Sequence, residues 1–139
     1  SSRAFVMRHL TLSILSCCLA LPVAGCRAAP VLTPVPILVQ EPRADMHEVI
    51  LRALPRRGWR VIADEPGKLT ARLHLRRHVA VVDILYVGDK VEFAYVSSEY
   101  LDYEVVDGVP TIHRNYNAWV ENLRDDIAEE LLVSRTTDS

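Results

Sequence analysis

The chain has 139 residues, of which half are hydrophobic, and a net charge of −2. All three cysteines lie within the first 26 residues, so the rest of the chain excludes disulfides, thiolate nucleophiles and cysteine-bound zinc. That remainder, roughly 110 residues, is enough chain for one domain with a single two-layer core.

Residues 1–25 have the anatomy of a secretory signal. A short basic segment precedes an apolar run that is too short for a membrane span, and small residues follow it. The run ends in Val23-Ala24-Gly25-Cys26, which resembles the lipobox of bacterial lipoproteins. In such proteins the cysteine is acylated and becomes the mature N-terminus. Two alternatives are an ordinary signal peptide and a short anchor helix.

A lipid on Cys26 would determine where the protein resides. Each buried methylene of an acyl chain contributes about 0.8 kcal/mol, so several chains hold a domain on a membrane essentially permanently. Arg27 follows the cysteine, whereas enterobacterial lipoproteins retained at the inner membrane carry aspartate there. The resemblance therefore implies the periplasmic face of the outer membrane, with the membrane as a partner through the lipid anchor. This compartment excludes nucleic acid as a partner.

Residues 26–43 are predicted to be the lipidated cysteine and an extended tether, because four prolines interrupt them without any helical or alternating period. A minor alternative is that Ile37-Leu38-Val39, between two prolines, adds an edge strand to the domain. The folded domain is predicted over residues 44–133, followed by a tail over residues 134–139.

Two helices bound the predicted domain. In the first, Asp45 and Glu48 have the spacing of a capping box, an apolar face follows, and Pro55 and Gly58 end the helix. The second helix has a longer apolar stripe with charged residues on its other side. Its stripe comprises Tyr116, Trp119, Val120, Leu123, Ile127, Leu131 and Leu132.

Short β-rich runs over residues 59–97 predict a four-stranded antiparallel meander. A three-residue loop over 66–68 would place Val61 opposite Leu73, and a two-residue turn at Gly88-Asp89 would place Ile84 opposite Phe93. One sheet face is then almost wholly apolar. The predicted fold is an α+β two-layer sandwich in the order α-β-β-β-β-α, with both helices on that face.

The other sheet face is less polar than a solvent face should be. Two explanations stand: β-rich surfaces tolerate valine, or this face docks against an envelope protein or a second copy of the chain. It mixes Ile62, Val79, Val81, Leu85, Ala94 and Val96 with Arg60, Arg72, His74, Asp83 and Glu92.

Charge is also segregated along the chain. Eight of the 16 basic residues lie between Arg52 and Arg77, where Asp64 and Glu65 are the only acids. The fold could neutralise these charges against the acidic C-terminal half, or it could leave a basic patch facing anionic lipid or glycan.

The densest polar cluster joins residues 97–103 to residues 112–119. Together with Arg57-Gly58-Trp59 and Asp83-Ile84-Leu85-Tyr86, it resembles a group of small proteobacterial outer-membrane lipoproteins of unknown function, over most of residues 45–130. The candidate binding residues are Tyr100, Asp102, Tyr103, His113, Asn115 and Tyr116. A structural interpretation competes: the polar members, with Asn117, satisfy backbone groups and cap the last helix, while the aromatic ones fill its underside.

No catalytic residue, cofactor or metal is predicted. His113, Asp102 and a nearby serine lack a glycine-flanked elbow, and His74 and His78 fall on opposite sheet faces. The expected function is that of a non-enzymatic binding or accessory module in envelope assembly or secretion. The alternative is a glycan- or peptide-binding lipoprotein that uses the region from Tyr100 to His113.

Overall fold

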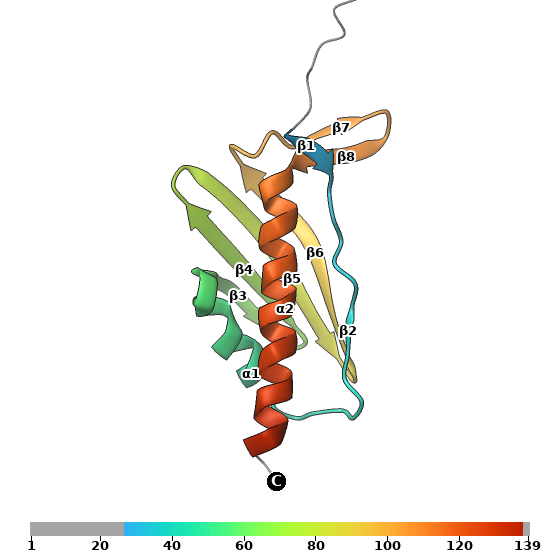
Figure 1. Cartoon of the computed structure of the whole chain (residues 1–139), viewed down its shortest axis with the longest axis vertical. Coiled ribbons are helices and arrows are strands. Elements are labelled where there is room, and N and C mark those ends of the chain that lie inside the picture. Colours follow the sequence, from blue (N-terminus) through green and yellow to red (C-terminus); the bar gives the residue numbers. More distant parts are fainter. Residues whose placement is uncertain (1–26, 138–139) are drawn as a thin grey trace, which may run out of the picture.

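The computed structural model describes residues 27–137 as an α+β fold with two antiparallel sheets (Figure 1). The expected signal segment and Cys26 lie outside the described residues. The five-stranded sheet has the order β2-β6-β5-β4-β3 and the three-stranded sheet the order β1-β8-β7. Within these residues the elements are β1 (Ala28–Pro30), β2 (Ile37–Leu38), α1 (Met46–Ala53), η1 (Leu54–Arg57), β3 (Arg60–Glu65), β4 (Lys68–Leu75), β5 (His78–Val87), β6 (Lys90–Glu99), β7 (Glu104–Val106), β8 (Val109–His113) and α2 (Arg114–Thr137).

The expected meander forms β3 to β6, and most of its register is confirmed. Ile84 faces Phe93, and the two-residue turn between β4 and β5 pairs Leu73 with Ala80. The first hairpin differs from the prediction, because Val61 faces Ala71 and a bulge precedes Ala63. Its turn has two residues, and Gly67 supplies the positive φ of 77° that such a turn requires.

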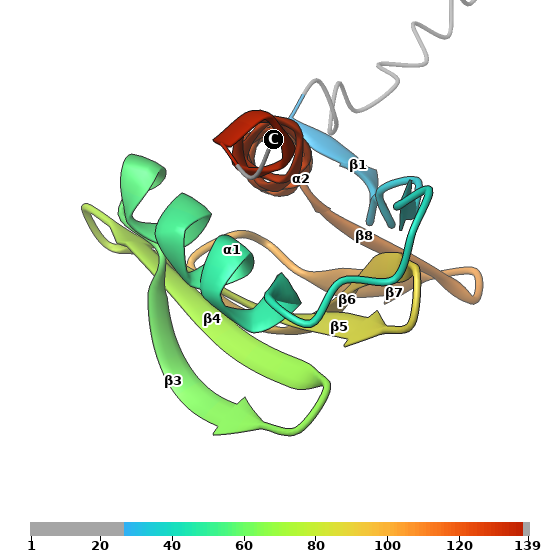
Figure 2. The same cartoon turned by 90° about the horizontal axis from the view of Figure 1, so that it is seen from below.

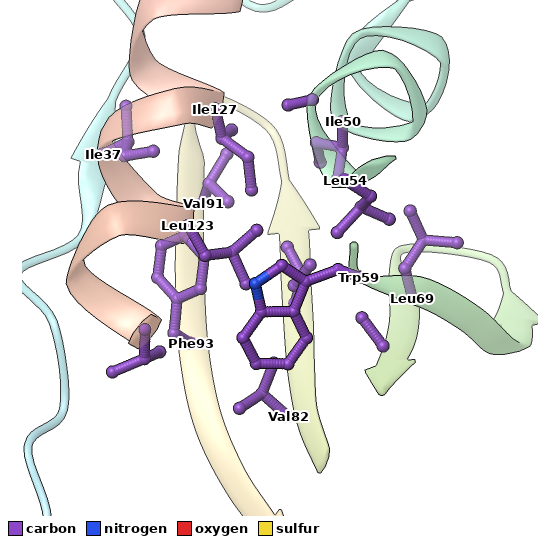
Figure 3. Packing of buried hydrophobic residues seen from close by; sticks show 14 of the residues in the cluster. Ile37, Ile50, Leu54, Trp59, Leu69, Val82, Val91, Phe93, Leu123 and Ile127 are labelled. Carbon is purple, nitrogen blue, oxygen red and sulfur yellow. The ribbon is translucent and has the colours of Figure 1, made fainter. Parts of the chain in front are cut away.

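Both helices cover the same face of the five-stranded sheet, as predicted (Figure 2). Their apolar residues and those of the sheet form one core, in which Trp59 is 2% exposed. Figure 3 shows its ring among side chains from both helices and the sheet. Trp119, expected at the centre of the apolar stripe, is only partly buried, and Leu132 is 67% exposed. The stripe is therefore narrower than its sequence period implied.

The first helix begins and ends differently from its sequence signature. Asp45 makes no side-chain cap, because its carboxylate accepts hydrogen bonds from the guanidinium of Arg43 at 2.7 and 2.8 Å. The expected capping box is thus not formed. Pro55 does not end the helix abruptly but sits in η1, and Gly58 closes this turn with a φ of 87°.

The segment expected to be a free tether is attached to the fold. Its strand β2 extends the edge of the large sheet by pairing Ile37 with Val91, which confirms the edge-strand alternative. Strand β1 pairs with β8, and the Asn117 side chain holds the backbone on both sides of Val31, donating to the Pro30 carbonyl and accepting from the Leu32 N–H. The described residues before α1 are therefore part of the body rather than a spacer.

The three-stranded sheet was not predicted. Strands β7 and β8 form a hairpin around Asp107-Gly108, and only Ile112 of their residues is buried. Because this hairpin exposes both of its faces, its sequence lacks the alternation that identifies a half-buried strand. The helix α2 begins at Arg114 and includes residues 134–137 of the expected tail.

Candidate functional site

The candidate site lies on the outer face of the five-stranded sheet, which is the face turned away from both helices (Figure 2). Ile62 on this face is 54% exposed, and Ala94 on β6, the partner of Asp83, is exposed on the same face of the sheet. Val96, expected on this face, lies instead in a bulge of β6 between Tyr95 and Ser97. Val79 and Val81 are buried, contrary to the expectation of an open apolar surface, yet they do not belong to the main core. Their partners on β4 are His74 and Arg72, whose long side chains can cover apolar neighbours with their stems.

Three of the eight basic residues between Arg52 and Arg77 pair with acids of the C-terminal half, and these pairs join α1 and η1 to α2. Arg52 and Arg56 both pair with Glu130 on α2, and Arg57 pairs with Asp126 at 2.7 Å. These hydrogen bonds hold the pKa of Glu130 below its ordinary value and raise that of Arg57 above its own. The basic residues of α1 and η1 are thus used to hold α2.

One arginine on β3 and one on β4 behave differently. Arg60 and Arg72 are exposed cross-strand partners, and neither forms an ion pair or side-chain hydrogen bond with any residue between 27 and 137. They line a cavity of about 510 Å³. The lining residues are Gly58, Arg60, Ile62, Arg72 and His74.

No acid among residues 27–137 forms an ion pair with either arginine, and the acids nearest in the sheet contact other side chains. Asp83 on β5 accepts a hydrogen bond from the Thr70 hydroxyl at 2.6 Å. Glu92 on β6 pairs with Lys90 at 2.8 Å, and Asp64 accepts from His47 on α1. The outer face therefore keeps two unpaired guanidinium groups beside apolar side chains.

The predicted aromatic and polar cluster is divided by the structure. Tyr116 is buried, and burial raises the pKa of its hydroxyl. Tyr103 stacks on Tyr95 with ring centroids 4.7 Å apart, and Tyr95 meets the Tyr116 ring edge-on. Tyr100 is 64% exposed and lies apart from this stack, with the Arg77 guanidinium 5.5 Å from its ring centroid.

The polar members of that cluster have mostly structural contacts. His113 caps α2, since its Nδ1 accepts the N–H of Asn115 at 3.2 Å, and Asn117 binds the backbone around β1. Asp102 and Asn115 are exposed, and Asp102 has a φ of 53°. For His113 and Asn117 these contacts favour the structural interpretation. The six candidate residues fall into separate groups, His113 with Asn115 and Tyr103 with Tyr116 through Tyr95, rather than into one site.

The candidate histidines lie apart, as the predicted register requires. His74 pairs with Val79 and faces outward, whereas His78 follows the turn and its ring contacts the Tyr100 carbonyl at 2.7 Å. Within residues 27–137, no group of three or more metal-binding side chains lies together, and no helix there is long and apolar enough to cross a membrane.

Sequence reasoning placed Arg60, Arg72 and His74 on one face but did not single them out as a site. The signal was present: Arg72 and His74 lie two residues apart on one face of β4, and Arg60 falls on the same face of β3. Comparison with protein-family models, curated proteins and solved structures finds no match for this chain. The assignment of the site therefore rests on its geometry.

Proposed function

We propose that this protein is a lipid-anchored, non-enzymatic binding module of the bacterial envelope, placed on the periplasmic face of the outer membrane. One observation carries the proposal: the outer sheet face combines exposed apolar side chains with arginines that have no acidic partner in the described structure. Such a surface suits binding, because both kinds of group gain from an external partner.

The start of the described chain supports an anchor close to the folded body. The Arg27 carbonyl accepts a hydrogen bond from the Arg114 N–H at 2.7 Å, which fixes residue 27 to the beginning of α2. Cys26 directly precedes this residue. An acylated Cys26 would thus hold the end of the body that carries β1, β7 and β8 at the membrane, without a flexible spacer (Figure 1).

The anchor is tested by replacing Cys26 with serine in cells that process lipoproteins. We expect the C26S protein to leave the membrane fraction and to lose labelling by a radioactive fatty acid, because no acyl chain remains. Arg27→Ala is the matched control and should stay on the membrane with its label. Equal membrane partitioning and labelling of the wild type and C26S proteins would overturn the lipoprotein assignment.

A further inference from the structure

The cavity between β3 and β4 has the size of a small-molecule site. Its volume of about 510 Å³ falls within the range of roughly 300–1,000 Å³ that is typical of ligand pockets. The hairpin curves away from the helices and makes this part of the outer face concave (Figure 2). Ile62 contributes an apolar wall, and the charged walls come from both strands.

Arg60 and Arg72 form an unfavourable pair of like charges. Residues directly opposite each other in an antiparallel ladder have Cα atoms about 4.5–5.5 Å apart, and like charges at such positions are destabilising. Neither guanidinium has an ion pair or hydrogen bond with the described residues, and Asp83 and Glu92 on the neighbouring strands contact Thr70 and Lys90 instead. An external anion between the two guanidinium groups would explain why two like charges lie opposite each other here.

We propose that this cavity binds the phosphate group of a ligand. Each guanidinium presents planar, parallel N–H donors that match phosphate oxygens, and two positive charges suit the charge of a phosphate better than that of a single carboxylate. His74 adds a third polar side chain at the wall, and Ile62 contacts the carbon part of the ligand. The inference rests on the proposed function, because it names what the outer face binds.

The position of the cavity favours a membrane lipid as the source of the phosphate. Strand β4 runs from Arg72 toward the end of the molecule that carries β1 (Figure 1). The turn after β4 is joined to that end, since the His78 ring contacts the Tyr100 carbonyl and Arg77 lies over the Tyr100 ring. A soluble phosphate ester offers the same chemistry, and the experiment separates the two sources.

The first arm measures binding of inorganic phosphate and glycerol phosphate to the full chain in nonionic detergent by titration calorimetry. We expect saturable binding that weakens about tenfold with either R60Q or R72Q, because each change removes charge-assisted hydrogen bonds. The matched control is R76Q, which removes one exposed positive charge outside the cavity and should leave the affinity within twofold. Added sodium chloride should weaken binding to the wild type.

The second arm measures co-sedimentation of the C26S chain with phosphatidylglycerol–phosphatidylcholine vesicles and with phosphatidylcholine vesicles. A loss of binding to the anionic vesicles with R60Q and R72Q but not R76Q identifies a lipid headgroup, whether or not the soluble probes bind. The same dependence with the soluble probes alone identifies a soluble ester.

The proposal is overturned if no probe binds saturably, or if the R76Q change weakens binding as much as the two cavity changes do. These outcomes leave the proposed function standing, because fractionation of the C26S protein tests the anchor independently of any phosphate.

Discussion

Replacing Trp59 with alanine should remove a large share of the stability of this domain. The side chain is 2% exposed and packs against both helices and the sheet (Figure 3). Burial of a tryptophan removes about 150–250 Å² from water, which at about 25 cal/mol per Å² corresponds to roughly 4–6 kcal/mol. Core tryptophan truncations cost about 3–5 kcal/mol, against a total of about 5–15 kcal/mol for a natural domain.

Two further variants make the Trp59 prediction specific. The indole Nε1 is buried without a hydrogen-bond partner among residues 27–137, and such an orphan donor costs about 1–3 kcal/mol. W59F should therefore cost less than about 2 kcal/mol, because it keeps an aromatic ring and removes the orphan donor. Trp119 is only partly buried, so W119A should cost clearly less than W59A.

The assay is urea unfolding followed by far-UV circular dichroism, which does not depend on the tryptophan signal that these variants alter. A free energy of unfolding for W59A within about 1 kcal/mol of the wild type would refute the reasoning, since a filled core position cannot be emptied at so small a cost. A larger effect of W119A than of W59A would refute the placement of Trp59, rather than Trp119, in the buried core.

Two smaller predictions concern charges. Hydrogen bonds from Arg52 and Arg56 hold the pKa of Glu130 below its ordinary value of 4.5, so its contribution to stability is complete above pH 4.5 and is lost as the pH falls through the lower folded-state pKa. In urea unfolding, the free energy of unfolding should therefore fall less between pH 7 and pH 3 for E130Q than for the wild type. An equal fall in the two proteins would contradict this linkage. Because Arg60 and Arg72 repel each other across the ladder, R72Q should raise the free energy of unfolding by about 0.2–1 kcal/mol at low salt and by less at high salt, and a destabilised variant would show that the Arg72 side chain packs favourably.

The sequence predicts the helix-covered sheet well because burial imposes a period on it. Ala80, Val82 and Ile84 alternate on β5, and a one-residue slip would have turned all three away from the helices. The register of the β3–β4 hairpin was predicted wrongly because β3 is an exposed edge strand, so no buried face determined which residues pair. The bulge before Ala63 could be accommodated there without emptying the core.

Elements held by long-range contacts could not be derived from local patterns. Strand β1 depends on β8, 83 positions later at Ala29 and Ile112, and neither segment alternates clearly in sequence. For the same reason, the sequence did not predict the candidate site. The folded register determines that Arg60 lies opposite Arg72, and composition does not reveal it. The register also determines which side chains contact the nearby acids Asp64, Asp83 and Glu92.

The central claim is that the outer sheet face is the binding face of this protein, and site-specific photo-crosslinking in intact cells tests it most directly. A photo-reactive amino acid is placed at Ile62 or Ala94 on that face, or at Leu132, an exposed apolar residue of α2, as the matched control. The account predicts discrete crosslinked adducts from positions 62 and 94 that exceed those from position 132. Equal adducts from all three positions, or adducts from position 132 alone, would contradict it.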